Sequence, residues 1–253
     1  MSRFLYGLNP VLEALKAHPR DVVRVLLERG RDGRLTDAGE RAVEAAATAG
    51  VRVEDAPRGE LSRRSRSGVH QGVGAELAEF RYAELPDLLE AAGARGEPPF
   101  LLLLDGVTDP QNAGALARSA HALGAHGLVV PKDRAAGIGP AAFKAAAGAL
   151  EHCPLARVTN LSRALEELKD AQVWSVALAP DGDRELSGID LTSGVALVLG
   201  SEGKGIRPLV RKTCDHVARI PMAGSVGSLN VGAAGAIALY EVARQRRSRR
   251  SAP

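Results

Sequence analysis

From about residue 100 onward, apolar segments of strand length alternate with segments of helical spacing. The first, 100–107 (FLLLLDGV), is a continuous apolar run, as expected of a strand buried on both faces. Further apolar runs follow at 127–131, 155–158, 173–179, 195–200 and 216–221. Helical spacing is found between them, at 112–123, 139–150, 160–170 and 206–213. This alternation predicts a mostly parallel sheet with helices on both faces, and a last long helix is expected from about Ser228 to Arg246.

The beginning of the chain carries a shorter pattern of the same kind. The runs 22–27 (VVRVLL) and 51–53 predict strands, and 36–49 predicts a helix between them. A polar, basic loop is expected over Arg58–Arg66, before a weak strand that begins after His70-Gln71-Gly72. This pattern indicates a small, compact α/β domain.

A change in composition separates this small domain, over residues 1–75, from a larger one. A short helix is expected near 85–92, and GARGEPP follows at 93–99, where glycine, proline and charge indicate an exposed connection. We therefore expect a linker with a connecting helix over 76–99 and a second α/β domain over 100–253.

Composition and charge allow a nucleic-acid partner without requiring one. The net charge is only +3, and an arginine-rich tail at 244–250 is expected to be flexible and to attract RNA non-specifically. Aromatic residues make up 3% of the chain, so an RNA-binding surface cannot depend mainly on base stacking.

Several classes of protein are disfavoured by what the sequence lacks. Cys153 and Cys214 form no CxxC pair, and the histidines show no metal-ligand spacing, so no disulfide framework and no metal site are expected. The first residues, MSRFLYGLNP, contain no apolar signal core, and no run is long enough to span a bilayer. We expect a cytoplasmic protein without a membrane partner.

Three polar, glycine-containing segments follow predicted strands, at 105–118, 200–205 and 220–230. Parallel α/β sheets bind ligands beyond the carboxyl ends of their strands, so these segments are candidates for a site. The segment GSEGKG at 200–205 is neither a dinucleotide fingerprint nor a P-loop, which argues against a nicotinamide-dependent enzyme. The carboxylate of Glu202 suits a cationic or polar cofactor better than a triphosphate.

Each of these residues taken alone also has a purely structural interpretation. Asn112 could satisfy backbone donors at a helix start, Ser228 could cap the last helix, and Arg118 could simply face solvent. The charged loop could likewise be a solvated surface.

All three segments together, in this order, resemble the SpoU family of RNA 2′-O-ribose methyltransferases. The matching motifs are DGVTDPQN at 105–112 with Arg118, LGSEGKG at 199–205, and IPM at 220–222 followed by SLNV at 228–231. The chain departs from the family pattern at Gly227 and Gly232, where many relatives carry serine. Both changes remove hydroxyl groups near the expected site but retain Ser228 and Asn230.

Within the family, the chain is most similar to the RlmB-like branch, which modifies a guanosine of large-subunit ribosomal RNA. The segments that carry this similarity are Tyr6-Gly7, VHQG at 69–72, VPKDR at 130–134 and RVTNL at 157–161. Alternatives that stay open are a transfer-RNA substrate, an adenosine in ribosomal RNA, and a non-catalytic RNA-binding protein of ribosome assembly.

The resemblance implies a fold, a cofactor and a set of site residues. It implies a trefoil-knotted C-terminal domain that forms a homodimer, preceded by a ribosomal-protein-like RNA-binding domain. The implied cofactor is S-adenosyl-L-methionine, and the implied partner is large-subunit ribosomal RNA. The implied catalytic residues are Asn112, Arg118, Glu202, Ser228 and Asn230. The implied cofactor-binding residues are Leu199, Gly200, Gly203, Ile220, Met222, Ser228, Leu229 and Asn230. Candidate RNA-binding residues are Arg58, Arg63, Arg64, Arg66 and His70.

The role of Arg118 has two interpretations. The family's members are thought to use this arginine in deprotonating the ribose hydroxyl, but a guanidinium keeps its proton at ordinary pH. The alternative is that Arg118 holds a substrate phosphate while Glu202 orients the arginine.

Overall fold

The computed structural model describes residues 3–66, 69–133, 139–225 and 227–250. Arg134, the last residue of the VPKDR segment, and Val226, inside the third motif, lie outside the described residues. The chain divides into two compact units: Met1–Arg81 together with Ile138–His152, and Tyr82–Gly137 together with Cys153–Pro253.

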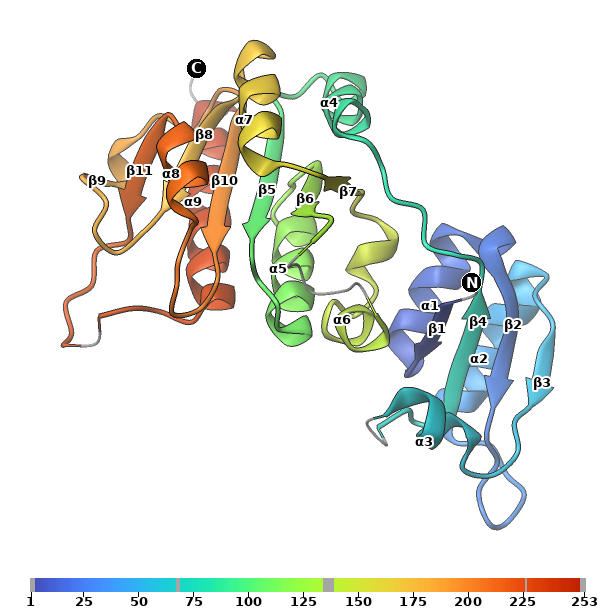
Figure 1. Ribbon diagram of the computed structural model, residues 1–253. Helices are drawn as coiled ribbons and strands as arrows, with labels where there is room; N and C mark the ends of the chain where they lie inside the picture. The colour runs from blue at the N-terminus through green and yellow to red at the C-terminus, as the bar shows by residue number, and fades with distance from the viewer. Residues whose placement is uncertain (1–2, 67–68, 134–138, 226, 251–253) are drawn as a thin grey trace. The chain divides into compact units, whose positions relative to one another are not determined.

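The first unit is built on a four-stranded sheet with the order β1-β4-β2-β3 (Figure 1). Its strands are β1 (Arg3–Tyr6), β2 (Val22–Leu27), β3 (Val53–Asp55) and β4 (Val73–Leu77). Its helices are α1 (Leu8–Ala17), α2 (Asp37–Ala49), α3 (Glu60–Ser65) and α6 (Pro140–Ala145), with short 3-10 turns at Pro19–Asp21 and Ala149–Glu151. The β2–β3 pair is parallel, and the pairs that β4 makes with β1 and β2 are antiparallel.

Some elements of this unit differ from the expectations. The sequence did not indicate β1 or α1, and the expected loop at 58–66 contains the helix α3. The expected helix at 139–150 is shorter, and it packs in this unit although it lies within the second half of the chain. Lys144 lies over the Tyr6 ring, 4.8 Å from its centroid, and Arg3 forms a 2.7 Å ion pair with Glu151.

The second unit contains a seven-stranded sheet with the order β7-β6-β5-β10-β8-β11-β9, and its registered pairs are all parallel. Its strands are β5 (Phe100–Asp105), β6 (Gly127–Pro131), β7 (Leu155–Val158), β8 (Trp174–Leu178), β9 (Arg184–Glu185), β10 (Val195–Gly200) and β11 (His216–Arg219). The predicted parallel α/β architecture is therefore confirmed. Only β9, of two residues, was not anticipated.

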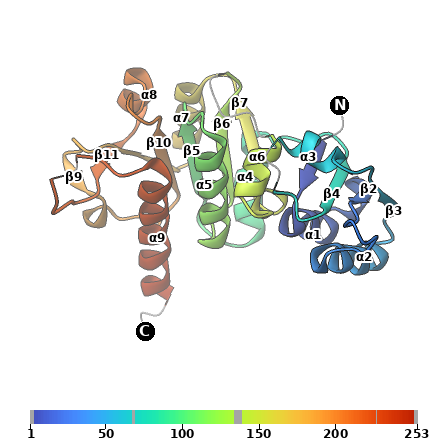
Figure 2. The same cartoon turned by 90° about the horizontal axis from the view of Figure 1, so that it is seen from below.

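Helices cover both faces of this sheet. They are α4 (Leu85–Ala94), α5 (Pro110–Ala122), α7 (Leu161–Asp170), α8 (Pro208–Thr213) and α9 (Val231–Arg250), with a 3-10 turn at Leu186–Gly188. Helices α5 and α9 lie side by side on one face, and α7 and α8 lie on the other (Figures 1 and 2). A Cβ on Gly235 would lie 2.2 Å from Leu116 Cδ2, so a larger residue here would require the Leu116 side chain between α9 and α5 to move.

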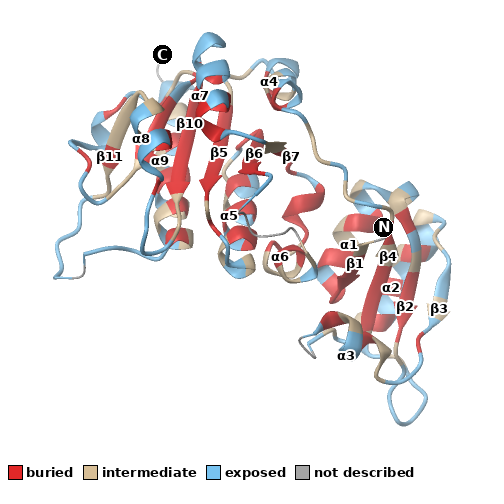
Figure 3. Cartoon of the chain, viewed as in Figure 1, coloured by how far each residue is buried: buried red, intermediate tan, exposed pale blue. Residues whose placement is uncertain are grey.

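The centre of the sheet is the most deeply buried part of this unit. Figure 3 shows β5 and β10 buried along almost their whole length. The chain runs outward from β5 to β6 and β7, and later places β10 and β8 on the opposite side of β5. Such a reversal of strand order leaves a crevice at the carboxyl ends of the strands, where α/β proteins bind ligands.

The arginine-rich end is helical over its described part, so the expectation of a flexible tail is wrong there. Helix α9 continues to Arg250. Arg246 donates hydrogen bonds to the carbonyls of Pro98, Pro99 and Ser193. Burial lowers the pKa of its guanidinium to about 10. Arg249 donates to Thr192, and Arg250 pairs with Glu97.

Candidate active site

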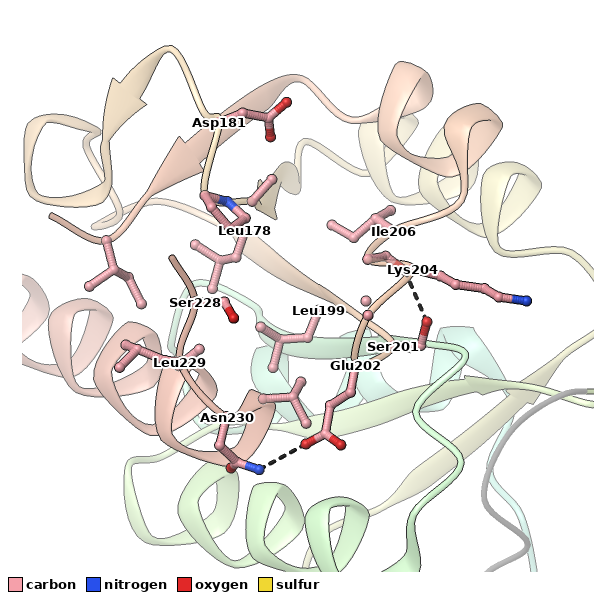
Figure 4. Close-up of a pocket in the computed structure, with 18 of the residues that line it drawn as sticks. Leu178, Asp181, Leu199, Ser201, Glu202, Lys204, Ile206, Ser228, Leu229 and Asn230 are labelled. Carbon is pink, nitrogen blue, oxygen red and sulfur yellow. Dashed lines mark hydrogen bonds between the residues drawn. The ribbon is translucent and has the colours of Figure 1, made fainter. Parts of the chain in front are cut away.

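A cavity of about 610 Å³ lies at the carboxyl edge of the large sheet. It is lined by the segments that follow β8, β10 and β11 and by the start of α9 (Figure 4). All eight predicted cofactor-binding residues line it: Leu199, Gly200, Gly203, Ile220, Met222, Ser228, Leu229 and Asn230. Of the predicted catalytic residues, Glu202, Ser228 and Asn230 line it as well.

The segment after β10 is a tight loop whose shape depends on glycine. Ser201 and Gly205 exchange backbone hydrogen bonds, which leaves Glu202 at the turn between them. A Cβ on Gly200 would lie 2.1 Å from the carbonyl carbon of Gly205, so no other residue fits without moving the loop. Gly203 has a φ of 83°, a conformation that disfavours other residues.

The three sequence motifs meet in one hydrogen-bonded cluster, hereafter the amide–carboxylate cluster of Asn112, Glu202 and Asn230. Glu202 Oε1 accepts hydrogen bonds from Asn112 Nδ2 and from Asn230 Nδ2, each at 2.8 Å. Asn230 Nδ2 also donates to Asn112 Oδ1 at 3.1 Å. The cluster thus joins the start of α5, the loop after β10 and the start of α9 beside the cavity. Figure 4 shows its contact between Glu202 and Asn230.

Backbone groups at the start of α9 fix the orientation of Asn230. Gly232 and Ala233 donate their backbone N–H groups to Asn230 Oδ1, at 2.9 and 3.3 Å. Asn230 is therefore the cap of α9, and the interpretation of Ser228 as the cap is wrong. Because the oxygen accepts from the helix, the NH₂ group must point toward Glu202.

Another residue, Asp109, provides the cap of α5, so the side chain of Asn112 is not used for that purpose. Asp109 accepts from the backbone N–H groups of Gln111 and Asn112. The structural interpretation of Asn112 as the residue that satisfies these donors is therefore wrong. Its side chain instead reaches Glu202.

Arg118 does not contact this cluster. Its side chain is exposed on α5 and forms no hydrogen bond or ion pair with any residue that the structure describes. The expectation that Glu202 orients Arg118 is therefore not met, because Glu202 accepts from the two asparagines instead.

The cavity has the mixed character that an adenosine-containing sulfonium cofactor requires. Its larger apolar lining side chains are Leu178, Leu199, Ile206, Ile220, Met222, Leu229 and Val231, and Ala179, Pro180 and Ala234 add to them. Such a surface suits a flat, weakly polar base. The lining carboxylates of Asp181 and Glu202 are balanced by Lys204 and Arg211, and Glu202 places its negative charge at the side of the amide–carboxylate cluster, where it would attract a sulfonium.

Sequence reasoning missed the segment after β8. Leu178 to Asp181 and Arg211 all line the cavity, and Asp181 pairs with Arg211 at 3.0 Å. The hydrogen bond from Arg211 lowers the pKa of Asp181. The available signal was position, because this segment also leaves the carboxyl end of a parallel strand.

Asp105, within the first motif, was also not assigned a role. Its carboxylate is buried at the end of β5 and accepts from Arg207 through both the backbone N–H, at 2.8 Å, and Nε, at 2.6 Å. Asp105 therefore holds the chain at Arg207, where the 200–206 loop ends.

The candidate RNA-binding residues all belong to the first unit. Arg58, Arg63 and Arg66 are exposed. Arg64 instead lies over the Phe4 ring and pairs with Glu76 at 2.6 Å. The other candidate, His70, accepts at Nδ1 from the Gly72 backbone N–H, so its protonated Nε2 donates to Ser62 Oγ.

Neither a metal centre nor a membrane span is found in the described part of the chain. Within the described ranges, no group of three or more acidic, histidine or cysteine side chains is arranged to hold a metal ion. Among the helices described, none combines the length and apolar character needed to cross a bilayer.

Comparison with known proteins matches both parts of the chain to RNA methyltransferases. Residues 99–240 match the SpoU rRNA Methylase family, and residues 4–83 match a model for RNA 2′-O ribose methyltransferase substrate binding. The Yersinia pestis 23S rRNA (guanosine-2′-O-)-methyltransferase RlmB is 45% identical over 249 residues, which cover 97% of this chain and 98% of the relative. The Photorhabdus laumondii protein of the same name is 42% identical over 252 residues, covering 98% of this chain and all (100%) of the relative.

A solved structure extends this similarity to three dimensions. The SpoU methyltransferase AviRb from Streptomyces viridochromogenes, in complex with the cofactor AdoMet, superposes with a TM-score of 0.80. It is 27% identical, and the match covers 98% of this chain and 91% of AviRb. The chain belongs to the SpoU rRNA methylase family and is an RNA methyltransferase.

Proposed function

We propose that the protein transfers a methyl group from S-adenosyl-L-methionine to the ribose 2′-hydroxyl of a guanosine in large-subunit ribosomal RNA. The observation that carries this proposal is the amide–carboxylate cluster at the edge of the cavity. Three segments far apart in sequence converge there, and a scaffold that only binds RNA has no need for them to do so. The guanosine and the ribosomal substrate rest on the RlmB relatives.

The bound cofactor would supply an electrophilic methyl group on a sulfonium centre. Acceptance of that methyl group by the ribose oxygen would require the hydroxyl to lose its proton, so the site must provide a proton acceptor. The side chains serve mainly to position these groups in line. The NH₂ groups of Asn112 and Asn230 fix the carboxylate of Glu202, whose Oε1 accepts from both. We assign Oε2 of Glu202 as the acceptor of the hydroxyl proton, since an ionised carboxylate oxygen can take a proton.

We assign Arg118 to an RNA phosphate next to the target ribose. A guanidinium stays protonated and presents a planar fork of donors that matches a phosphate. The exposed position of Arg118, without a partner among the described side chains, leaves this fork available to the substrate. The first unit is proposed to bind the negatively charged phosphates of the RNA backbone through the exposed Arg58, Arg63 and Arg66.

The proposal is tested by locating the methyl group. The purified protein is incubated with labelled S-adenosyl-L-methionine and unmodified large-subunit ribosomal RNA, and the RNA is then hydrolysed in alkali. A 2′-O-methyl group blocks the attack that cleaves the adjoining phosphodiester, so the label should survive in an alkali-resistant dinucleotide beginning with guanosine.

Other outcomes contradict the proposal in separate ways. Label released in mononucleotides would indicate base methylation. A dinucleotide beginning with adenosine, or transfer only to transfer RNA, would replace the proposed substrate. No transfer to free RNA or to assembly intermediates, with RNA binding retained, would favour the non-catalytic alternative.

A further inference from the structure

The ion pair between Asp181 and Arg211 is a polar feature of the cavity lining that the proposed chemistry does not use. Both residues line the cavity, and Arg211 Nη1 donates to Asp181 Oδ2 at 3.0 Å. The side chain of Asp181 is 69% exposed, and an exposed ion pair contributes little to stability. Its place at the cavity therefore calls for a role in binding.

The lining places the two ends of the cavity in different chemical environments. Figure 4 shows Asp181 on one side and the Glu202–Asn230 contact on the other, with Leu199 between them. The proposed function places methyl transfer beside the amide–carboxylate cluster. The side toward Asp181 therefore receives a part of the cofactor away from the reacting methyl.

Leu178 is the last residue of β8, Asp181 follows three residues later, and both line the cavity. An adenine that rests on the apolar lining brings its covalently attached ribose within the same region. The vicinal hydroxyls of a ribose are donors, and they need a strong acceptor that is not already saturated. Among the described lining residues the carboxylates are Asp181 and Glu202. The amides occupy Oε1 of Glu202 and the proposed function uses its Oε2 for the hydroxyl proton, so Asp181 is the carboxylate left for the diol.

We propose that Asp181, held in orientation by Arg211, binds the ribose diol of the cofactor. Arg211 contacts Oδ2, which leaves Oδ1 and further lone pairs to accept from the hydroxyls. An acidic side chain after a parallel strand performs the same task in dinucleotide-binding folds. This inference rests on the proposed cofactor but concerns a residue outside the three motifs.

The hydrogen bond from Arg211 also lowers the pKa of Asp181. The carboxylate therefore stays ionised at neutral pH, which is the form that only accepts hydrogen bonds.

The test is a calorimetric binding cycle that needs no turnover. Wild type and Asp181→Ala are titrated with S-adenosylhomocysteine and with its 2′-deoxy and 3′-deoxy analogues. Wild type should bind the deoxy analogues about tenfold or more weakly, the size expected for a lost hydrogen bond to a charged group. Asp181→Ala should bind S-adenosylhomocysteine about as weakly and should no longer distinguish the analogues. The matched control is Asp183→Ala, a nearby exposed carboxylate that does not line the cavity and should change nothing.

Arg211→Gln tests the orienting role separately. Arg211→Gln should lower the affinity for S-adenosylhomocysteine less than Asp181→Ala does. It should also keep part of the difference in affinity between S-adenosylhomocysteine and its deoxy analogues.

Two results would overturn the assignment while leaving the proposed function intact. One is a loss of affinity for the deoxy analogues, relative to S-adenosylhomocysteine, that is the same in Asp181→Ala as in wild type. This result would place the diol elsewhere. The other is an Asp181→Ala variant that binds S-adenosylhomocysteine more weakly than wild type but binds 5′-methylthioadenosine equally well. Because 5′-methylthioadenosine keeps the ribose and lacks the amino-acid end, this result would assign Asp181 to the amino-acid end of the cofactor. Failure of wild type to bind S-adenosylhomocysteine at all would instead overturn the proposed cofactor together with this assignment.

Discussion

Asn230 combines a structural and a chemical role in one side chain. Its oxygen accepts from two backbone N–H groups at the start of α9, and its NH₂ group donates to Glu202 and Asn112. A serine or an aspartate would cap the helix equally well, but neither provides the NH₂ donor. The helix start therefore explains the orientation of the amide, and the cluster explains why the cap is asparagine.

Replacing Asn230 by aspartate should separate these two roles. Asn230→Asp retains the cap but removes the donor and places a second carboxylate beside Glu202, so methyl transfer should fall about 100-fold or more. Thermal unfolding should change little. Asn230→Ala should also lose about 1 kcal/mol of stability, since the cap is lost. Equal stability losses in both variants would contradict the capping role.

Arg118 is expected to affect RNA and not the cofactor, because it does not line the cavity. Arg118→Lys should lower methyl transfer about tenfold or more, since lysine lacks the planar fork of donors, and Arg118→Ala should lower it further. The affinity for S-adenosylhomocysteine, measured by calorimetry, should stay within about twofold of wild type, well below the tenfold that one strong contact contributes. Arg163→Ala, which removes an exposed arginine of α7, is the matched control. A parallel loss of cofactor affinity in Arg118→Ala would refute the assignment to phosphate.

At the scale of elements, the site is formed by short connections whose shape the strands dictate. Gly200 is in register with Asp105 across the β5–β10 pair, and Asp105 in turn binds Arg207 at the far end of the loop. Both ends of the loop that carries Glu202 are therefore held by β5 or by its last residue. The buried strands thus position a loop that is itself exposed.

Gly200→Ala tests this dependence. The new Cβ would lie 2.1 Å from the Gly205 carbonyl carbon, so the loop must shift. We expect affinity for S-adenosylhomocysteine to fall about tenfold or more, with a stability loss of about 1–3 kcal/mol from overpacking. Gly188→Ala is the matched control, since a methyl group added there would meet no described atom within 4 Å and the φ of Gly188 is ordinary. Unchanged cofactor affinity in Gly200→Ala would show that the loop shape is not required.

At the scale of the whole molecule, a buried histidine couples stability to pH. His126 Nδ1 accepts from the Phe100 backbone N–H at 3.0 Å, so the folded state holds the neutral ring with the proton on Nε2. Burial, followed by the nearby charge of Arg95, lowers the pKa of His126 below its ordinary 6.5. Between the two pKa values the unfolded chain binds more protons than the folded one, so acidification favours unfolding there.

The free energy of unfolding should therefore fall as the pH is lowered below about 6.5, and the contribution of His126 should level off below its folded pKa. Denaturant titrations between pH 5 and 7 measure this slope. His126→Gln, which does not titrate, should be less stable overall but should show a shallower slope. Identical slopes for the two proteins would contradict the assignment.

The homodimer implied by the resemblance is a further expectation at this scale. Ile237 and Tyr240, three residues apart on α9, leave adjacent apolar surface exposed, at 44% and 51% exposure, which a partner helix could cover. Sedimentation should give twice the 26.4 kDa chain mass, and Ile237→Arg should shift the equilibrium toward the monomer. A monomer at micromolar concentration would contradict the expectation. The trefoil knot stays a prediction of the resemblance.

The sequence by itself determined the parallel α/β class, most strand positions of the larger unit and the three motifs of the site. It could do so because buried parallel strands are continuous apolar runs, and because the three polar segments together match the SpoU family in order, although each alone also has a structural interpretation. It failed for α1 and α3, where proline or charged residues obscure short helices.

Only the tertiary structure decided which polar side chains meet. Asn112 and Asn230 lie far apart in the chain, yet each donates to Glu202 at 2.8 Å. The structure also revealed Asp181 and Arg211 at the cavity, and it showed the segment 139–152 packing in the first unit. Periodicity reports which residues are buried in an element, because burial repeats along it. The contact between two loops depends on the order of strands in the sheet, and no local pattern in the sequence encodes that order.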